Sequence, residues 1–245
     1  MNASNKQALL GVGTNYKTIK SKKVGVLTGI LYMAPYTLSG KNVCPNASAG
    51  CAAACLNTAG RGAMKSVKRA RLKKTNRFWD DRGQFLQDLA EEVGKLQRRA
   101  EAIGMLAAVR LNGTSDLPYE RYKVPGTDKN IMELFPAVQF YDYTKLENRF
   151  IGKKLPANYH LTFSRAEDND HKLAAVLEYT SASVVFSGKL PATWRGYPVI
   201  DGDEHDARFT DAGPGTIIGL TAKGKARHDG SGFVVPSHGT DSTWN

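Results

Sequence analysis

The sequence lacks any long hydrophobic run. Nothing in its 245 residues approaches the roughly 20 consecutive apolar residues that a transmembrane helix needs. The first fifteen residues are polar apart from Leu9 and Leu10, so they do not form the apolar segment of a secretory signal peptide. We therefore predict a protein that has no contact with a membrane and stays in the cytoplasm.

Common ligand-binding motifs are also missing. The segment 11–13 (GVG) lacks the third glycine of a dinucleotide fingerprint, and 213–215 (GPG) lacks the Lys-Ser/Thr of a P-loop. The acidic segment 201–208 (DGDEHDAR) does not have the spacing of an EF-hand. The glycine-rich segments therefore do not indicate phosphate binding.

Cysteine is scarce, but the three cysteines of the chain lie close together in the sequence. Cys44, Cys51 and Cys55 fall within twelve residues, with Ser, Ala and Gly around them. In a reducing cytoplasm, clustered cysteines indicate metal binding or catalysis rather than disulfides. Small neighbours also let backbone amides approach the sulfur atoms. We predict that these three residues are metal ligands.

The identity of the metal centre has three alternatives. A [4Fe–4S] cluster accepts three protein thiolates and leaves one iron open for a substrate or cofactor. Structural zinc would need a fourth ligand from a distant His or Asp. The third alternative is three ordinary thiols without a metal. The iron–sulfur cluster is the prediction that we carry forward.

The alternation of apolar and amphipathic segments predicts an α/β fold. Strand-like runs and helical segments follow one another at spacings typical of βαβ units in a parallel sheet. We expect a partial or complete (β/α) barrel with the cysteine loop over one end. The expected strands lie at 24–34, 105–111, 137–143, 159–164, 183–187 and 216–220, and the expected helices at 64–79, from Asp80 or Asp81 to Gly104, at 130–135 and at 171–179.

The same pattern predicts a single domain with two irregular ends. The domain covers 24–227 and includes the cysteine loop at 35–59. Residues 1–23 form a polar, basic tail or a peripheral strand. The Gly/Ser/His-rich segment 228–245 is expected to be irregular.

Polar residues follow several of the expected strands. Ligands of parallel α/β folds bind at the carboxyl ends of the strands, so we predict cofactor-facing side chains there. His205 in the acidic segment is also the first candidate for a fourth cluster ligand or a proton donor. The predicted cofactor-binding residues are Asn112, Ser115, Asp116, Asp142 and His205.

The formal net charge of +11 favours an anionic partner. Seven Lys or Arg residues occupy the expected helix at 64–79, which ends with Phe78 and Trp79. Cations beside aromatic rings suit nucleic acid, where phosphates and bases are bound together. The alternative is a solvated helix whose charge is balanced by the acids Asp88, Glu91 and Glu92 of the next helix.

Two resemblances add to this interpretation. Three cysteines in a loop after the first strand of an α/β chain resemble the cluster loop of radical S-adenosylmethionine enzymes, although the spacing here is C-x6-C-x3-C instead of C-x3-C-x2-C. This resemblance implies S-adenosylmethionine as a cofactor, with the turn 110–116 (RLNGTSD) receiving its amino group.

The segments CPNASAGCAAACLNTAG, SVKRARLKKTNRFWDDRGQFLQDLAEE, VIDGDEHDARF and IIGLTAKGKAR resemble the actinobacteriophage gene product 88 family. That family has no assigned reaction, and the resemblance implies a viral protein made in a bacterial cytosol. The leading hypothesis is therefore a phage iron–sulfur protein of radical S-adenosylmethionine-like design. The residues leave open whether it is an enzyme. The alternatives are a nucleic-acid-binding phage protein with a structural iron–sulfur or zinc centre, and a structural phage protein with incidental cysteines.

Overall fold

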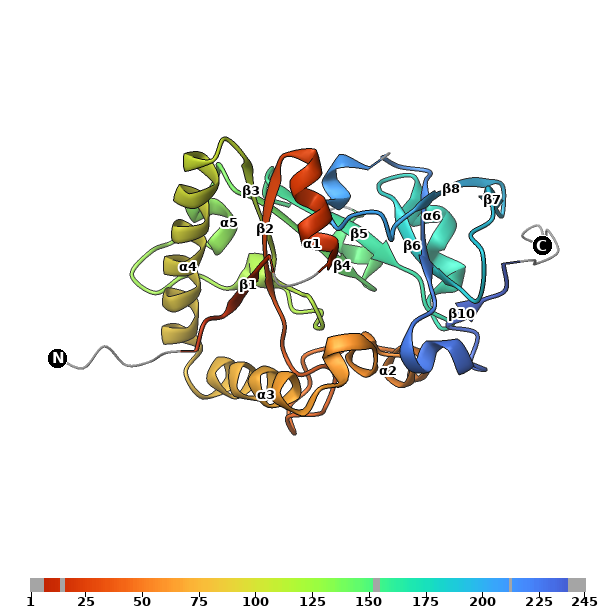
Figure 1. Cartoon of the computed structure of the whole chain (residues 1–245), viewed down its shortest axis with the longest axis horizontal. Helices are drawn as coiled ribbons and strands as arrows, with labels where there is room; N and C mark the ends of the chain where they lie inside the picture. The colour runs from red at the N-terminus through yellow and green to blue at the C-terminus, as the bar shows by residue number, and fades with distance from the viewer. Residues whose placement is uncertain (1–6, 14–15, 152–154, 212, 238–245) are drawn as a thin grey trace.

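A computed structural model describes residues 7–13, 16–151, 155–211 and 213–237. Its centre is a ten-stranded sheet with the order β1-β2-β3-β4-β5-β6-β9-β8-β7, in which β10 pairs with β6 (Figure 1). The strands are β1 (Leu10–Val12), β2 (Val26–Leu31), β3 (Leu106–Arg110), β4 (Gln139–Thr144), β5 (Tyr159–Ser164), β6 (Ala182–Phe186), β7 (Thr193–Trp194), β8 (Tyr197–Asp201), β9 (Ile217–Thr221) and β10 (Val234–Val235).

Most of the sheet is parallel. The pairs from β2 through β3, β4, β5, β6 and β9 to β8 are all parallel, whereas β1 and β7 are antiparallel to their neighbours. All six residues of β2 are buried, as expected for a strand covered on both faces. The parallel strands therefore end at one common edge of the sheet, which we call the carboxyl edge.

Helices cover one face of the sheet and the carboxyl edge. Apolar residues of α4 and α5 pack on β2–β5 in one core cluster, and those of α6 pack on β5, β6 and β9 in a second. In Figure 1, α2 and α3 lie along the lower edge of the sheet, where the parallel strands end. The helices are α1 (Tyr16–Ser21), α2 (Ala49–Ala53), α3 (Lys65–Asp80), α4 (Arg82–Ala102), α5 (Ile131–Leu134) and α6 (Leu173–Leu177).

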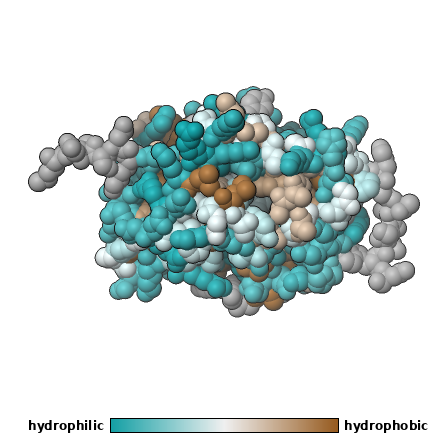
Figure 2. All heavy atoms as spheres, turned by 90° about the horizontal axis from the view of Figure 1, so that it is seen from below, coloured by the Kyte–Doolittle hydropathy of each residue, from teal (hydrophilic) through white to brown (hydrophobic). Residues whose placement is uncertain are grey.

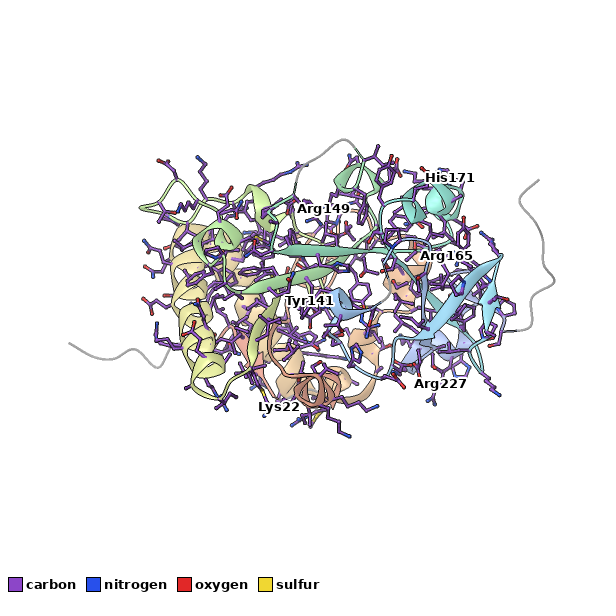
Figure 3. All side chains as sticks on the ribbon, turned by 90° about the horizontal axis from the view of Figure 1, so that it is seen from above. Lys22, Tyr141, Arg149, Arg165, His171 and Arg227 are labelled. Atoms are coloured by element: carbon purple, nitrogen blue, oxygen red, sulfur yellow. The ribbon has the colours of Figure 1, made fainter. Side chains whose placement is uncertain are left out.

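The opposite face carries a smaller cluster. Val26, Ala108 and Tyr141 pack there against Ala207 and Phe209, from the segment that follows β8. Figure 3 shows Tyr141 near the middle of the molecule, beside this segment. Asp206 accepts hydrogen bonds from the Tyr141 hydroxyl (2.9 Å) and, as an ion pair, from Arg110 (3.1 Å). The end of the acidic segment thus packs on this face of the sheet.

The predicted α/β fold is confirmed, but the predicted partial or complete (β/α) barrel is not. Among the described residues the sheet is open, with β1 and β7 at the two ends of its path. The segment predicted as a tail or peripheral strand contains β1 and α1, and β10 lies in the segment predicted to be irregular. Residues 1–6, 14–15 and 238–245 of these two segments fall outside the described residues. Each described helix is either too short or too polar to span a membrane.

A buried polar network links β3 to β4 and β5 on the helix-covered face. Asn112, just after β3, donates to the Asp142 carboxyl group through its backbone N–H (2.6 Å) and its side chain (3.1 Å). The Tyr159 hydroxyl donates a third hydrogen bond of 2.9 Å. Asp142 is fully buried, and burial raises its pKa to about 7 although these donors act in the opposite direction.

The raised pKa of Asp142 predicts a pH-dependent contribution to stability. The folded protein keeps this proton up to about pH 7, whereas the unfolded chain loses it near its ordinary pKa of about 4. The stabilising contribution is therefore complete below about pH 4, decreases up to about pH 7 and is constant above that. Each pKa unit is worth about 1.4 kcal/mol, so the decrease amounts to about 4 kcal/mol at most.

Urea unfolding of the wild type and of Asp142→Asn between pH 4 and pH 8 measures this contribution, because the amide does not titrate. The free energy of unfolding of the wild type, minus that of the variant, should fall across this range. A difference that does not change with pH would contradict the assignment.

Candidate functional site

The cysteine loop leaves the sheet at the end of β2 and crosses the carboxyl edge. The backbone N–H of Ala34 donates to the Thr75 hydroxyl of α3 (2.8 Å). Further along the loop, the Val43 carbonyl accepts from the backbone N–H of Asp116 (2.9 Å), in the turn after β3. These bonds hold the loop against both α3 and the neighbouring strand end.

Cys44 lies in a tight turn of this loop. Its sulfur accepts a hydrogen bond from the backbone N–H of Tyr36 at 3.3 Å. Tyr36 has a φ of 51°, in the left-handed region that a residue with a large side chain rarely adopts. The residue that donates its N–H to the Cys44 sulfur therefore has a strained backbone conformation.

Cys51 and Cys55 lie on the short helical turns that follow. Ser48 caps α2, and its hydroxyl accepts from the backbone N–H of Cys51 (3.0 Å). The Lys145 side chain, just after β4, is a hydrogen-bond partner of the Cys51 thiol, and the backbone N–H of Asn57 is one for Cys55. Each of the three sulfur atoms therefore has an N–H donor that lowers the pKa of its thiol, two of them from the cysteine loop itself and one from Lys145.

The three thiols lie within electrostatic reach of one another. Burial raises the pKa of all three, and that of Cys44 reaches about 12. Negative charge on Cys55 or Cys51 raises the pKa of Cys44 further. Without a bound cation the thiols therefore stay protonated at neutral pH, and the binding of a metal would displace their protons.

Glu167, in the turn after β5, fixes α2 at the carboxyl edge. Its two carboxylate oxygens accept from the Ser48 hydroxyl (2.8 Å) and from the backbone N–H of Gly50 (2.7 Å). A Cβ atom at Gly50 would lie 2.1 Å from the Ser231 hydroxyl and 2.7 Å from Glu167. Only glycine therefore allows α2 to approach these two side chains so closely.

Arg71 of α3 packs against the cysteine loop. It is buried, donates to the Asn57 side chain (2.7 Å) and lies over the Tyr32 ring at 4.9 Å. Its charge lowers the pKa of Cys55, against the larger effect of burial. Arg71 and Lys145 thus place two positive charges near the sulfur atoms.

The predicted cofactor-binding residues lie in three different places. Asp116 faces the cysteine site, where its charge raises the pKa of Cys44 and Cys51. Asn112 and Asp142 are bonded to each other in the core, and Ser115 donates to Asn112 (2.8 Å). His205 lies 3.7 Å from Asp211 on the other face of the sheet, beside Arg208.

Sequence reasoning missed three residues of this site, Arg71, Lys145 and Glu167. Lys145 and Glu167 directly follow predicted strands, so the argument that selected Asn112 and Asp116 also applied to them. Arg71 carried no such signal, because its charge was attributed to the exposed surface of a basic helix. Its burial depends on the loop that packs over it.

Two further observations describe the surroundings of the cysteines. Among the described residues, no group of three or more His, Cys, Asp or Glu side chains is arranged to hold a single metal ion. A cavity of about 400 Å³ lies beside α2, where Ala53 and Ala54 face Lys225 and His228 of a 3-10 helix, η8 (Gly224–His228).

Comparison with known proteins places the chain in a family without assigning it a reaction. No curated protein and no solved structure matches it significantly. The sequence model of the family described as Gene product 88 matches residues 6–237, which is almost the whole chain. The matched region includes the cysteine loop and the acidic segment. The chain therefore belongs to the gene product 88 family of bacteriophage proteins.

Proposed function

We propose that the protein binds a [4Fe–4S] cluster through Cys44, Cys51 and Cys55, and that this centre serves redox chemistry at the carboxyl edge. One observation carries the proposal: three thiols from a single loop lie within electrostatic reach of one another, and a hydrogen-bond donor to each sulfur lowers the pKa of its thiol. Such donors stabilise thiolates and tune the reduction potential of iron–sulfur clusters. The cluster would supply one electron at a time.

A cluster suits the arrangement better than zinc. A single zinc ion needs four ligands gathered around one point. The described residues offer no such group, and His205, the predicted fourth ligand, lies on the other face of the sheet. A cube of four irons is larger, and each of its cysteine ligands binds a separate iron. Three sulfur atoms that are near one another without converging on one point therefore favour the cluster.

The charges around the site also favour a cluster. A four-iron cube with three thiolate ligands is anionic, so a buried site needs compensating positive charge. Lys145 and Arg71 are the cations that act on Cys51 and Cys55. Asp116 and Glu167 act on Cys51 in the opposite sense.

The strand order supports a radical S-adenosylmethionine-like design. The parallel strands β2 to β6 are neighbours in chain order, as in a partial (β/α) barrel, and the cysteine loop follows the first of them. An open fourth iron would then face a cofactor such as S-adenosylmethionine. Of the residues predicted to bind this cofactor, Asp116 is the one whose charge raises the pKa of Cys44 and Cys51. Asn112 and Ser115 would shape the turn that carries Asp116.

Anaerobic reconstitution tests the proposal. The wild type should bind about four irons and four sulfides per chain and show the broad visible absorption of thiolate-bound clusters. Replacement of Cys44, Cys51 or Cys55 by Ala should remove most of both, because each thiol ligates one iron. Ala53→Ser, in the same helix, is the matched control and should keep full occupancy. A colourless, folded wild type with stoichiometric zinc would reject the cluster.

The hydrogen bonds between Glu167 and the start of α2 give a second prediction. Glu167→Ala removes two hydrogen bonds at the start of α2, so Cys51 should lose its fixed position and cluster occupancy should fall by about half or more. Asp168→Ala, at the exposed neighbouring position, should leave occupancy unchanged. Iron analysis and circular dichroism of both variants separate loss of the site from loss of the fold. Equal occupancy in the two variants would argue against this role of Glu167.

A further inference from the structure

Two basic segments that are far apart in the sequence flank the cysteine site. In Figure 1, α3, α2 and η8 form a row along the carboxyl edge. The backbone N–H of Lys225 donates to the Thr58 hydroxyl (3.3 Å), which ties η8 to the cysteine loop. The exposed basic residues of this face are Lys65, Lys68, Arg69 and Lys73 on α3 and Lys225, Arg227 and His228 on η8.

The cations of α3 divide into an inner and an outer set. Lys74 donates to the Leu9 carbonyl (2.6 Å), Arg77 pairs with Asp88, and Arg71 lies beneath the cysteine loop. These three residues stabilise the fold. The exposed cations of α3 are therefore a separate set, available to a partner.

If α3 were only a solvated helix, the acids of α4 would be expected to pair with its exposed cations. Asp88 is buried against Arg77. The Glu92 carboxylate accepts from the backbone N–H groups of Leu9 and Leu10, each at 2.8 Å. Asp88 is thus paired with a cation of the inner set, and the Glu92 carboxylate is held at the backbone of Leu9 and Leu10, so neither forms an ion pair with the outer set.

Exposed apolar side chains lie on the cysteine loop or next to it. Tyr36, Leu38, Leu56 and Met64, which are 40–60% exposed, belong to the cysteine loop or border it. Figure 2, which looks onto this end of the molecule, shows hydrophobic side chains near the middle of a mostly hydrophilic face. The cavity beside α2 opens in the same region, next to Lys225 and His228.

We propose that the carboxyl edge binds a single-stranded nucleic acid across the cysteine site, and that nucleic acid is the substrate class of this site. Phosphates would lie on the outer cations of α3 and on η8, while unstacked bases would contact Tyr36 and the other exposed apolar residues of the cysteine loop. A duplex would keep its bases stacked and leave this apolar centre uncovered. The substrate assignment rests on the proposed cluster, whereas the binding does not.

Binding is tested by fluorescence anisotropy of a labelled mixed-sequence single-stranded oligonucleotide. The purified full chain should bind at low salt, and the affinity should fall steeply as salt is added. Lys68→Glu/Arg69→Glu/Lys73→Glu and Lys225→Glu/Arg227→Glu should each weaken binding by about tenfold or more.

The matched control is Lys95→Glu/Arg98→Glu/Arg99→Glu, which reverses three exposed cations of α4 away from the carboxyl edge. It changes net charge as much as the α3 variant does, and it should leave the affinity within about twofold. Melting temperatures confirm that each variant is folded. No binding by the wild type, or equal losses in the α3 variant and the control, would overturn the proposal. Tighter binding to anionic lipid vesicles or to duplex DNA through the same residues would overturn it as well.

The position of the nucleic acid is tested through the cysteines of cluster-free protein. A saturating oligonucleotide should slow the alkylation of Cys51 and Cys55 by iodoacetamide severalfold, and the α3 variant should lose this protection. Unchanged alkylation together with intact binding would reject nucleic acid as the substrate of this site. Because neither assay needs the cluster, a failure of cluster assembly is distinguishable from a failure of nucleic-acid binding.

Discussion

The common direction of the central strands is the constraint on which the site depends. Because β2, β3, β4 and β5 run parallel, the segments that follow them all emerge at one edge of the sheet. The loop after β2 supplies the three cysteines. The turns after β3, β4 and β5 supply Asp116, Lys145 and Glu167. Charged groups from three separate turns therefore surround a single group of thiols.

Burial and charge act against each other at this edge. Burial favours the protonated thiols, whereas the N–H donors and the nearby cations favour thiolates. A bound metal would resolve the conflict, because it replaces the protons and supplies positive charge where the solvent cannot. Three ordinary buried thiols would not need a separate donor for each sulfur.

Local sequence patterns predicted the helices and strands whose boundaries are set by residues within or next to them. The apolar run 159–164 gives β5 with the predicted bounds, and the Asp81 side chain caps α4 through the backbone N–H of Gln84 (2.9 Å), where one of the two predicted caps stood. Closure of the sheet could not be predicted in this way. It depends on how the first and last strands are placed, and no local pattern records that placement. The positions of Arg71 and His205 depend on long-range packing in the same manner.

The acidic segment shows how a dense polar motif can serve packing. In the sequence its acids, its histidine and its arginine suggested metal binding or proton transfer. In the fold, Asp206 is buried against Arg110 and Tyr141, and Arg208 is buried beside Asp211. A buried ion pair is strongly destabilised when one partner is removed, so such residues have a structural reason to occur together.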